Sequence, residues 1–320
     1  MKIVKNVLSV IGIIALSGLF INAVVMPNEN DATITKNEKL KNEEEGGFHE
    51  HYKIFALKVP DQLNFAGEKV PLEDPDVYER MDRELLVNTY WQSNGLLLIK
   101  RANKYFPIIE PILKKNGIPD DFKYLAVIES GLQNVVSPAG ARGFWQLMSG
   151  TAKDQGLEVN DNVDERYNIV KATQAACEYI KESKERFGSW TLAAASYNAG
   201  QFGISKQLDR QKVDDYYDVL LGDETSRYVF RILAVKEILS HPKQYGFNYT
   251  QDDLYQNIPT YTVEVDTAVS DFADFAAKYG ITYKTLKIHN PWLREAHLNN
   301  KSRKQYFIDI PEKGYYPAKK

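Results

Sequence analysis

One carboxyl group in this sequence lies where it could act as an acid. Residues 119–131 carry a helical pattern in which Phe122 and Leu125 mark an apolar face, and Glu129 follows Phe122 by seven residues on that face. Burial disfavours a charged carboxylate and raises its pKa. A carboxylic acid that keeps its proton near neutral pH can serve as a general acid. A structural glutamate, tied to an arginine or a tyrosine, fits the same pattern.

Two later segments add groups that suit an uncharged polar ligand. Residues 140–148 combine glycines, which let the backbone approach a ligand closely, with two large aromatic residues and Gln146. Residues 195–200 place Tyr197 and Asn198 at the predicted end of a helix. Aromatic rings and amides around one acid indicate a site for a ligand rich in hydroxyl and amide groups, such as a sugar.

Four short motifs follow one another along the chain. They are Glu129-Ser130-Gly131-Leu132, Gly143-Phe144-Trp145-Gln146-Leu147-Met148, Ser196-Tyr197-Asn198-Ala199-Gly200 and Glu224-Thr225-Ser226-Arg227-Tyr228-Val229. In this order they resemble the catalytic domain of lytic transglycosylases, and most of all its membrane-bound type D branch. The resemblance implies a mainly α, lysozyme-like domain over residues 52–247, with its motif core at 118–240.

The resemblance implies that Glu129 is the single catalytic carboxylate. It would protonate the oxygen between N-acetylmuramic acid and N-acetylglucosamine in peptidoglycan. It would then accept the proton of the C6 hydroxyl, which attacks the anomeric carbon of the same sugar. The product would be a 1,6-anhydromuramyl end, formed without water. A second carboxylate, which hydrolytic glycosidases use, is then unnecessary because the attacking hydroxyl is already in place.

The resemblance also assigns substrate-binding residues around this glutamate. Gln146 and Asn198 would bind N-acetyl and hydroxyl groups, and Tyr228 would hold the glutamate. Ser130 would orient the glutamate or the sugar, although a bond to its own helix backbone is the alternative. Tyr197 would line the cleft or lie in the core. The two aromatic residues at 144 and 145 are either sugar platforms or core.

Other functions remain open from the sequence. A hydrolase of the goose-type lysozyme kind would need a second carboxylate facing Glu129, and a non-catalytic cell-wall binding protein or a helical envelope protein would need none. The candidates for that second carboxylate are Asp120, Asp121, Asp154 and Asp164.

A smaller unit follows the helical part, with a boundary between residues 245 and 260. It is predicted to be α+β, with segments in the order strand, helix, helix, strand at 261–265, 269–279, 285–289 and 306–310. Residues 260–312 resemble a LysM module, the small peptidoglycan-binding fold. Val265 stands where the family usually has the glycine of Gly-Asp-Thr, which puts glycan binding by this module in question.

The beginning of the chain is typical of an exported protein. Lys2 and Lys5 precede an almost wholly apolar stretch at 7–21, so residues 1–26 are predicted to be a signal peptide or an uncleaved membrane anchor. No cysteine follows, which excludes a lipoprotein anchor. Residues 27–51 are polar and read as a charged flexible tether. We expect the protein in the bacterial cell envelope, in the periplasm, with or without attachment to the inner membrane.

Composition excludes several other classes. Lysine and arginine number 40 against 43 acidic residues, a net charge of −3, so a protein that coats nucleic acid is not expected. Cys177 is the one cysteine and is read as a core residue rather than a nucleophile. The five histidines have no metal-binding spacing on a predicted helix. We therefore expect no metal and no cofactor. The resemblance implies peptidoglycan strands as the partner.

Overall fold

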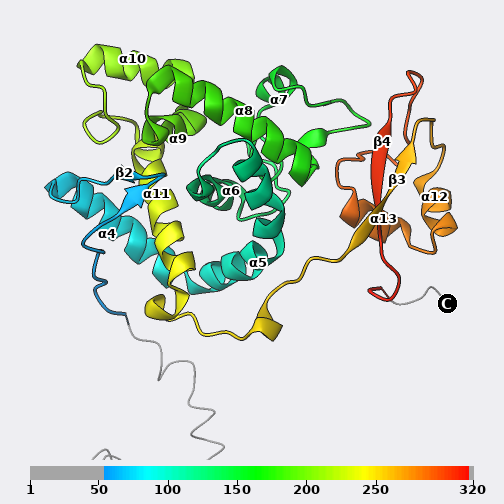
Figure 1. Cartoon of the computed structure of the whole chain (residues 1–320), viewed down its shortest axis with the longest axis horizontal. Coiled ribbons are helices and arrows are strands. Elements are labelled where there is room, and N and C mark those ends of the chain that lie inside the picture. Colours follow the sequence, from blue (N-terminus) through cyan, green and yellow to red (C-terminus); the bar gives the residue numbers. More distant parts are fainter. Residues whose placement is uncertain (1–53, 317–320) are drawn as a thin grey trace, which may run out of the picture. The chain divides into compact units, whose positions relative to one another are not determined.

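The computed structural model describes residues 54–316, which are mostly helical (Figure 1). A two-stranded hairpin comes first, with β1 at Asn64–Phe65 and β2 at Glu68–Lys69. The helices that follow are α4 Pro75–Tyr90, α5 Gln92–Lys115, α6 Lys123–Ser130, α7 Ser149–Asp154, α8 Ile169–Phe187, α9 Trp190–Ala199, α10 Gln201–Gln211 and α11 Asp223–Ser240. Single 3-10 turns lie at Asp120–Phe122, Glu165–Tyr167, Pro242–Tyr245 and Gln251–Asp253. The prediction of a mainly helical part is confirmed.

Local sequence signals set the ends of these helices. Asp74 caps α4 by accepting a bond from the backbone N–H of Asp76 at 2.8 Å, and Pro75 fills the first helical position, where no N–H is needed. Gly131 ends α6 and Gly188 ends α8, each in the left-handed conformation. Gly131 also ends the helical pattern that the sequence predicts at 119–131, whereas the hairpin, α7 and α10 were not predicted.

One hydrophobic core joins the helices from α4 to α11. In Figure 1, α6 lies among α5, α8, α9 and α11, and it packs on α5 and α11. The long helix α11 also packs on α4 and α9. Glu84 on α4 is buried and forms an ion pair with Arg227 on α11 at 2.6 Å. Because α6 is surrounded in this way, its last turn is held by several neighbours.

The C-terminal residues form a strand–helix–helix–strand unit. Its elements are β3 Thr260–Val265, α12 Phe272–Lys278, α13 Tyr283–His289 and β4 Tyr306–Pro311. The two strands are antiparallel, with Tyr261 opposite Ile310. The predicted order of elements is confirmed.

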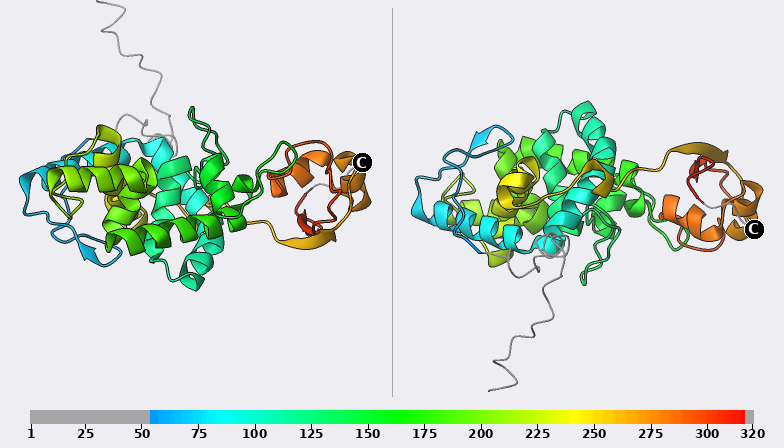
Figure 2. Two further views of the ribbon diagram at one scale, coloured as in Figure 1. Left: turned by 90° about the horizontal axis from the view of Figure 1, so that it is seen from above. Right: turned by 90° about the horizontal axis from the view of Figure 1, so that it is seen from below.

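A second hydrophobic core lies inside this unit, and two of its members come from the helical part. They are Val163 and Tyr167, which belong to the segment between α7 and α8. Both views of Figure 2 show this green segment reaching the orange and red residues. The backbone N–H of Asp164 bonds the carbonyl of Trp292 at 2.9 Å, and the N–H of Arg294 bonds that of Asn162 at 2.9 Å. The segment at 158–167 therefore belongs to both cores.

The predicted signal or anchor at 1–26 and the predicted tether at 27–51 lie outside the described residues. Within residues 54–316, no helix is both long enough and apolar enough to cross a membrane. The predicted domain limits at 52–247 and 260–312 remain predictions.

Candidate active site

Glu129 lies in the last turn of α6, with its side chain partly buried. The hydroxyl of Tyr228, a buried residue of α11, donates a hydrogen bond to Glu129 Oε1. Burial raises the pKa of Glu129 to about 7, although the Tyr228 bond acts in the opposite direction because it favours the charged form. The carboxyl group can thus hold a proton near neutral pH and release it there.

Two charged groups of α11 also act on this carboxyl. Arg231 is close enough to lower the pKa of Glu129, and Glu224 is close enough to raise it. Arg231 itself is fixed by a bond from its guanidinium to the carbonyl of Ile128 at 3.0 Å. The sequence reasoning assigned no role to either residue, although Glu224 stands in one of the quoted motifs.

Asn198 is linked to the same helix. Its amide nitrogen donates to Glu224 Oε1 at 3.2 Å, and its amide oxygen accepts from the hydroxyl of Thr225 at 2.7 Å. Both ends of the amide are therefore oriented by α11. A ligand that bonds Asn198 would share these groups or replace their bonds.

Residues 143–148 form a loop beside the end of α6. Ser130 Oγ donates to the carbonyl of Phe144 at 2.8 Å, and Tyr197 Oη donates to that of Trp145 at 2.7 Å. Ser130 Oγ also bonds the carbonyl of Ala126 in its own helix at 3.1 Å. Two residues expected at the substrate thus position the backbone of this loop, and their contact with a sugar remains a prediction.

Gln146 has a left-handed backbone, with φ at 46°. Its amide nitrogen donates to the carbonyls of Val135 at 3.1 Å and Gly143 at 2.7 Å. These bonds fix the side chain, so the amide oxygen is the atom better placed to accept a bond from a ligand.

The two aromatic residues before Gln146 are core residues. Trp145 is fully buried, and its Nε1 donates to Thr173 Oγ1 at 2.8 Å. Phe144 is also buried and meets Tyr105 edge to face. Of the two readings that the sequence left open, the structure supports core rather than sugar platform.

The aspartates considered as a second carboxylate have other partners. Asp120 pairs with Lys123 at 2.5 Å, and Asp121 pairs with Lys236 at 2.7 Å. Asp164 is buried and pairs with Arg166. None of these three, nor Asp154, is among the charges that shift the pKa of Glu129.

Cys177 lies buried in α8, and burial raises the pKa of its thiol to about 12. A thiol that resists ionisation in this way is a poor nucleophile. Across residues 54–316, no three histidine, cysteine or acidic side chains gather as a metal site would require.

The structure combines a helical domain, in which Glu129 is a partly buried acid of raised pKa, with a small strand–helix–helix–strand unit, and the comparisons give the class of protein. Residues 106–219 match the Transglycosylase SLT domain, and residues 261–314 match the Soluble lytic transglycosylase C-terminal LysM-like domain. The chain thus carries the domain of the lytic transglycosylases followed by a LysM-like domain.

The comparison with curated proteins gives distant relatives. The "Membrane-bound lytic murein transglycosylase D" of Escherichia coli strain K12 is 28% identical over 262 residues, which are 79% of this chain and 56% of that protein. The protein of the same name from E. coli O6:H1 strain CFT073 matches equally. A "Putative tributyltin chloride resistance protein" of Alteromonas sp. strain M-1 is 27% identical over 114 residues, which are 35% of this chain and 55% of that protein. The chain is thus a distant homologue of lytic transglycosylase D and spans about half the length of these relatives.

Proposed function

We propose that this protein is a peptidoglycan lytic transglycosylase. It cleaves the β-1,4 bond between N-acetylmuramic acid and N-acetylglucosamine without water and leaves 1,6-anhydromuramyl ends. Glu129 donates its proton to the glycosidic oxygen and then takes the proton of the attacking C6 hydroxyl. Tyr228 holds the carboxyl group in one orientation through both steps, while Gln146 and Asn198 offer amide groups to the sugar.

The observation that carries the proposal is the environment of Glu129. The same group must give a proton and then take one, so its two forms should differ little in free energy at the working pH. A pKa of about 7 meets this condition. The neighbouring carboxylate of Glu224 already accepts a bond from Asn198, which leaves Glu129 as the carboxyl group whose chemistry the site favours.

The test is the mass of the released fragments. Purified peptidoglycan is digested with the protein, with Glu129→Gln, and with Glu79→Gln as a matched control on the exposed surface of α4. We expect anhydro ends, lighter by one water than reducing ends, from the unchanged protein and from Glu79→Gln. Glu129→Gln should release at least about a thousandfold less, because the amide can neither give nor take the proton.

A hydrolase is the second candidate, and Glu224 is the reason for keeping it. This carboxylate acts electrostatically on Glu129, and an inverting hydrolase needs such a second carboxylate to activate a water molecule on the face of the sugar opposite to the acid. If the digest contains reducing ends, and Glu224→Gln no longer releases them, the protein is a hydrolase rather than a transglycosylase. If no fragment is released, a non-catalytic cell-wall binding protein becomes the better description.

We also propose that the protein works in the cell envelope. The printed name of the distant relative describes a membrane-bound murein enzyme, and the residues predicted as a signal or anchor agree with this location. Fractionation of cells, with detection of the full chain in membrane and periplasmic fractions, distinguishes an anchored from a released protein.

A further inference from the structure

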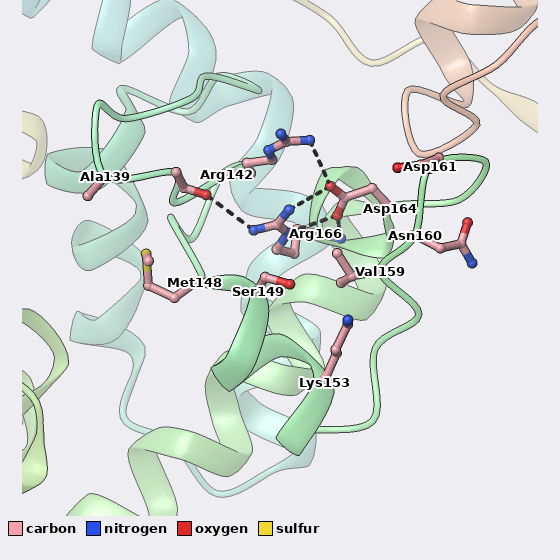
Figure 3. A pocket seen from close by; sticks show the side chains of 11 residues that line it. Ala139, Arg142, Met148, Ser149, Lys153, Val159, Asn160, Asp161, Asp164 and Arg166 are labelled. Atoms are coloured by element: carbon pink, nitrogen blue, oxygen red, sulfur yellow. Dashed lines mark hydrogen bonds and ion pairs between the residues drawn. The ribbon is translucent and has the colours of Figure 1, made fainter.

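An open pocket of about 640 Å³ lies beside the candidate site in the helical part (Figure 3). Its lining comes from the segment at 139–142, from the beginning of α7 and from the segment at 159–166. No role has been given to it so far. Three basic side chains line it, namely Arg142, Lys153 and Arg166, together with the acids Asp161 and Asp164.

One acid and one base of the pocket neutralise each other. Arg166 binds both oxygens of Asp164, with Nε to Oδ1 at 2.9 Å and Nη2 to Oδ2 at 2.8 Å. Its remaining terminal nitrogen bonds the carbonyls of Gly140 at 3.3 Å and Leu147 at 3.2 Å. Both residues are buried. The pair is saturated and forms a neutral, rigid wall.

The other two bases have bonding capacity left. Arg142 reaches Asp164 Oδ2 at 3.3 Å with one terminal nitrogen, yet its buried Nε has no partner in the described part of the chain. That nitrogen is itself inaccessible, but the side chain as a whole is 39% exposed, so its terminal nitrogens can meet a ligand oxygen. Lys153 is exposed and has no ion pair within residues 54–316, and Figure 3 shows it pointing toward Asp164 and Arg166.

The balance of charge favours an anion. With the neutral pair set aside, Arg142 and Lys153 face Asp161, so the pocket keeps a net positive charge. A guanidinium with a free edge matches a carboxylate, because two parallel N–H bonds can form. Asp161 on the rim can accept a bond from an adjacent N–H group, as a peptide would supply.

The pocket adjoins the loop that carries Gln146. The 143–148 loop is bonded to Ser130 and Tyr197 at its beginning, close to Glu129. Its last residue, Met148, is exposed and lines the pocket. A glycan strand held at Glu129 bears peptides on its muramic acid residues, and these peptides carry the carboxylates nearest to the sugar.

We propose that this pocket binds a carboxylate of the peptide attached to the muramic acid, with Arg142 and Lys153 as its cationic partners. The inference rests on the proposed function and extends it, because it makes peptide-bearing strands the preferred substrate. Arg142 supplies the paired N–H bonds, and Lys153 supplies a second charge from α7.

Two substrates distinguish recognition of the peptide from recognition of the glycan. Intact peptidoglycan strands and the same strands stripped of peptides by an amidase are digested by the unchanged protein, Arg142→Gln, Lys153→Gln and Arg142→Lys. We expect the preference of the unchanged protein for intact strands, measured as a ratio of kcat/KM, to fall about tenfold in Arg142→Gln through a higher KM. Arg142→Lys should recover part of it, since charge returns without the paired bonds. Lys206→Gln, an exposed change on α10, is the matched control and should keep the preference.

Two outcomes would overturn the proposal. The first is an equal loss on both substrates, which would make Arg142 a structural residue. The second is an unchanged preference in both Gln variants. If the unchanged protein cleaves neither substrate, the proposed function itself fails, which is a different result from these two. The pocket is then tested alone, by calorimetric titration with the peptide that the amidase releases. Binding lost in Arg142→Gln would support the pocket, and absence of binding to the unchanged protein would end the proposal.

Discussion

At the scale of single residues, the site is a carboxyl group whose two protonation states are brought close in free energy. Burial of Glu129 disfavours its charge, while Tyr228 and Arg231 favour it, and the pKa of about 7 is the result. The sequence predicted the burial from the helical spacing and the Tyr228 contact from the family resemblance. It could not predict the influence of Arg231 or Glu224, because their distance from Glu129 depends on how α11 packs on α6.

Tyr228→Phe tests this balance. The change keeps the buried ring but removes the bond that stabilises the charged carboxylate, so the pKa of Glu129 should rise above about 7. The alkaline limb of the pH–rate profile should move to higher pH. The value of kcat should fall about ten- to a hundredfold as the carboxyl loses its orientation. A limb that moves to lower pH would contradict this account.

The raised pKa also predicts a dependence of stability on pH. Between about pH 4.5 and 7 the folded protein retains a proton that the unfolded chain releases, so the free energy of unfolding falls as the pH rises through this range. Glu129→Gln has no such titration. Near pH 8 its free energy of unfolding, measured in urea, should exceed that of the unchanged protein by about 2 kcal/mol. Near pH 4 no comparable gain should appear. An equal difference at both pH values would mean that titration of Glu129 is not its source.

At the scale of elements, the 143–148 loop is held by groups from three helices. Gly143 has φ at 80°, and a Cβ atom there would lie 2.0 Å from the carbonyl oxygen of Arg166. The backbone of residue 143 thus lies against the backbone of Arg166, and only glycine fits at this position. The loop that presents Gln146 is consequently fixed against the same segment that reaches the second core.

Gly143→Ala should destabilise the protein by about 2–4 kcal/mol, because the contact is with backbone and the φ angle is unfavourable for alanine. Gly150→Ala is the matched control. It lies in α7, and no atom is within 4 Å of its added Cβ, so its effect should be neutral or slightly stabilising. Chemical denaturation of both variants measures the difference. Equal effects would mean that the close approach at residue 143 relaxes without cost.

Whether a feature could be predicted depends on how far along the chain the residues that determine it lie from one another. The ends of α6 and α8 were predictable because Gly131 and Gly188 act within one turn. The short helix α7 was missed because it carries little apolar periodicity and includes Gly150. The role of Trp145 was left open for a different reason, since its buried partner Thr173 lies 28 residues away.

At the scale of the whole molecule, the two cores are joined by side chains as well as by the chain that links them. Val163 and Tyr167 lie in the core of the LysM-like part, and Arg294 of that part stacks on the Tyr167 ring at 4.1 Å. Asn162 donates to the carbonyl of His297 at 2.8 Å and accepts from the N–H of Asn299 at 2.7 Å. No sequence pattern predicted these contacts, because they join segments more than 120 residues apart.

Asn162→Ala removes both of these bonds. It should lower the free energy of unfolding by about 1–3 kcal/mol and the Tm by about 3–6 °C, with one transition in calorimetry because the two cores depend on each other. Asn248→Ala, an exposed position after α11, should leave the Tm unchanged. Two separate transitions in the unchanged protein would show that the cores unfold independently.

The segment at 158–167, which belongs to both cores, also affects how the protein behaves after proteolytic cleavage. Residues 246–259 connect the two parts through the chain, and the bonds and apolar contacts made by residues 158–167 hold the parts together as well. A single proteolytic cut within the connection should therefore yield two fragments that elute together from a sizing column. They should separate only in denaturant, as the halves of a nicked protein do.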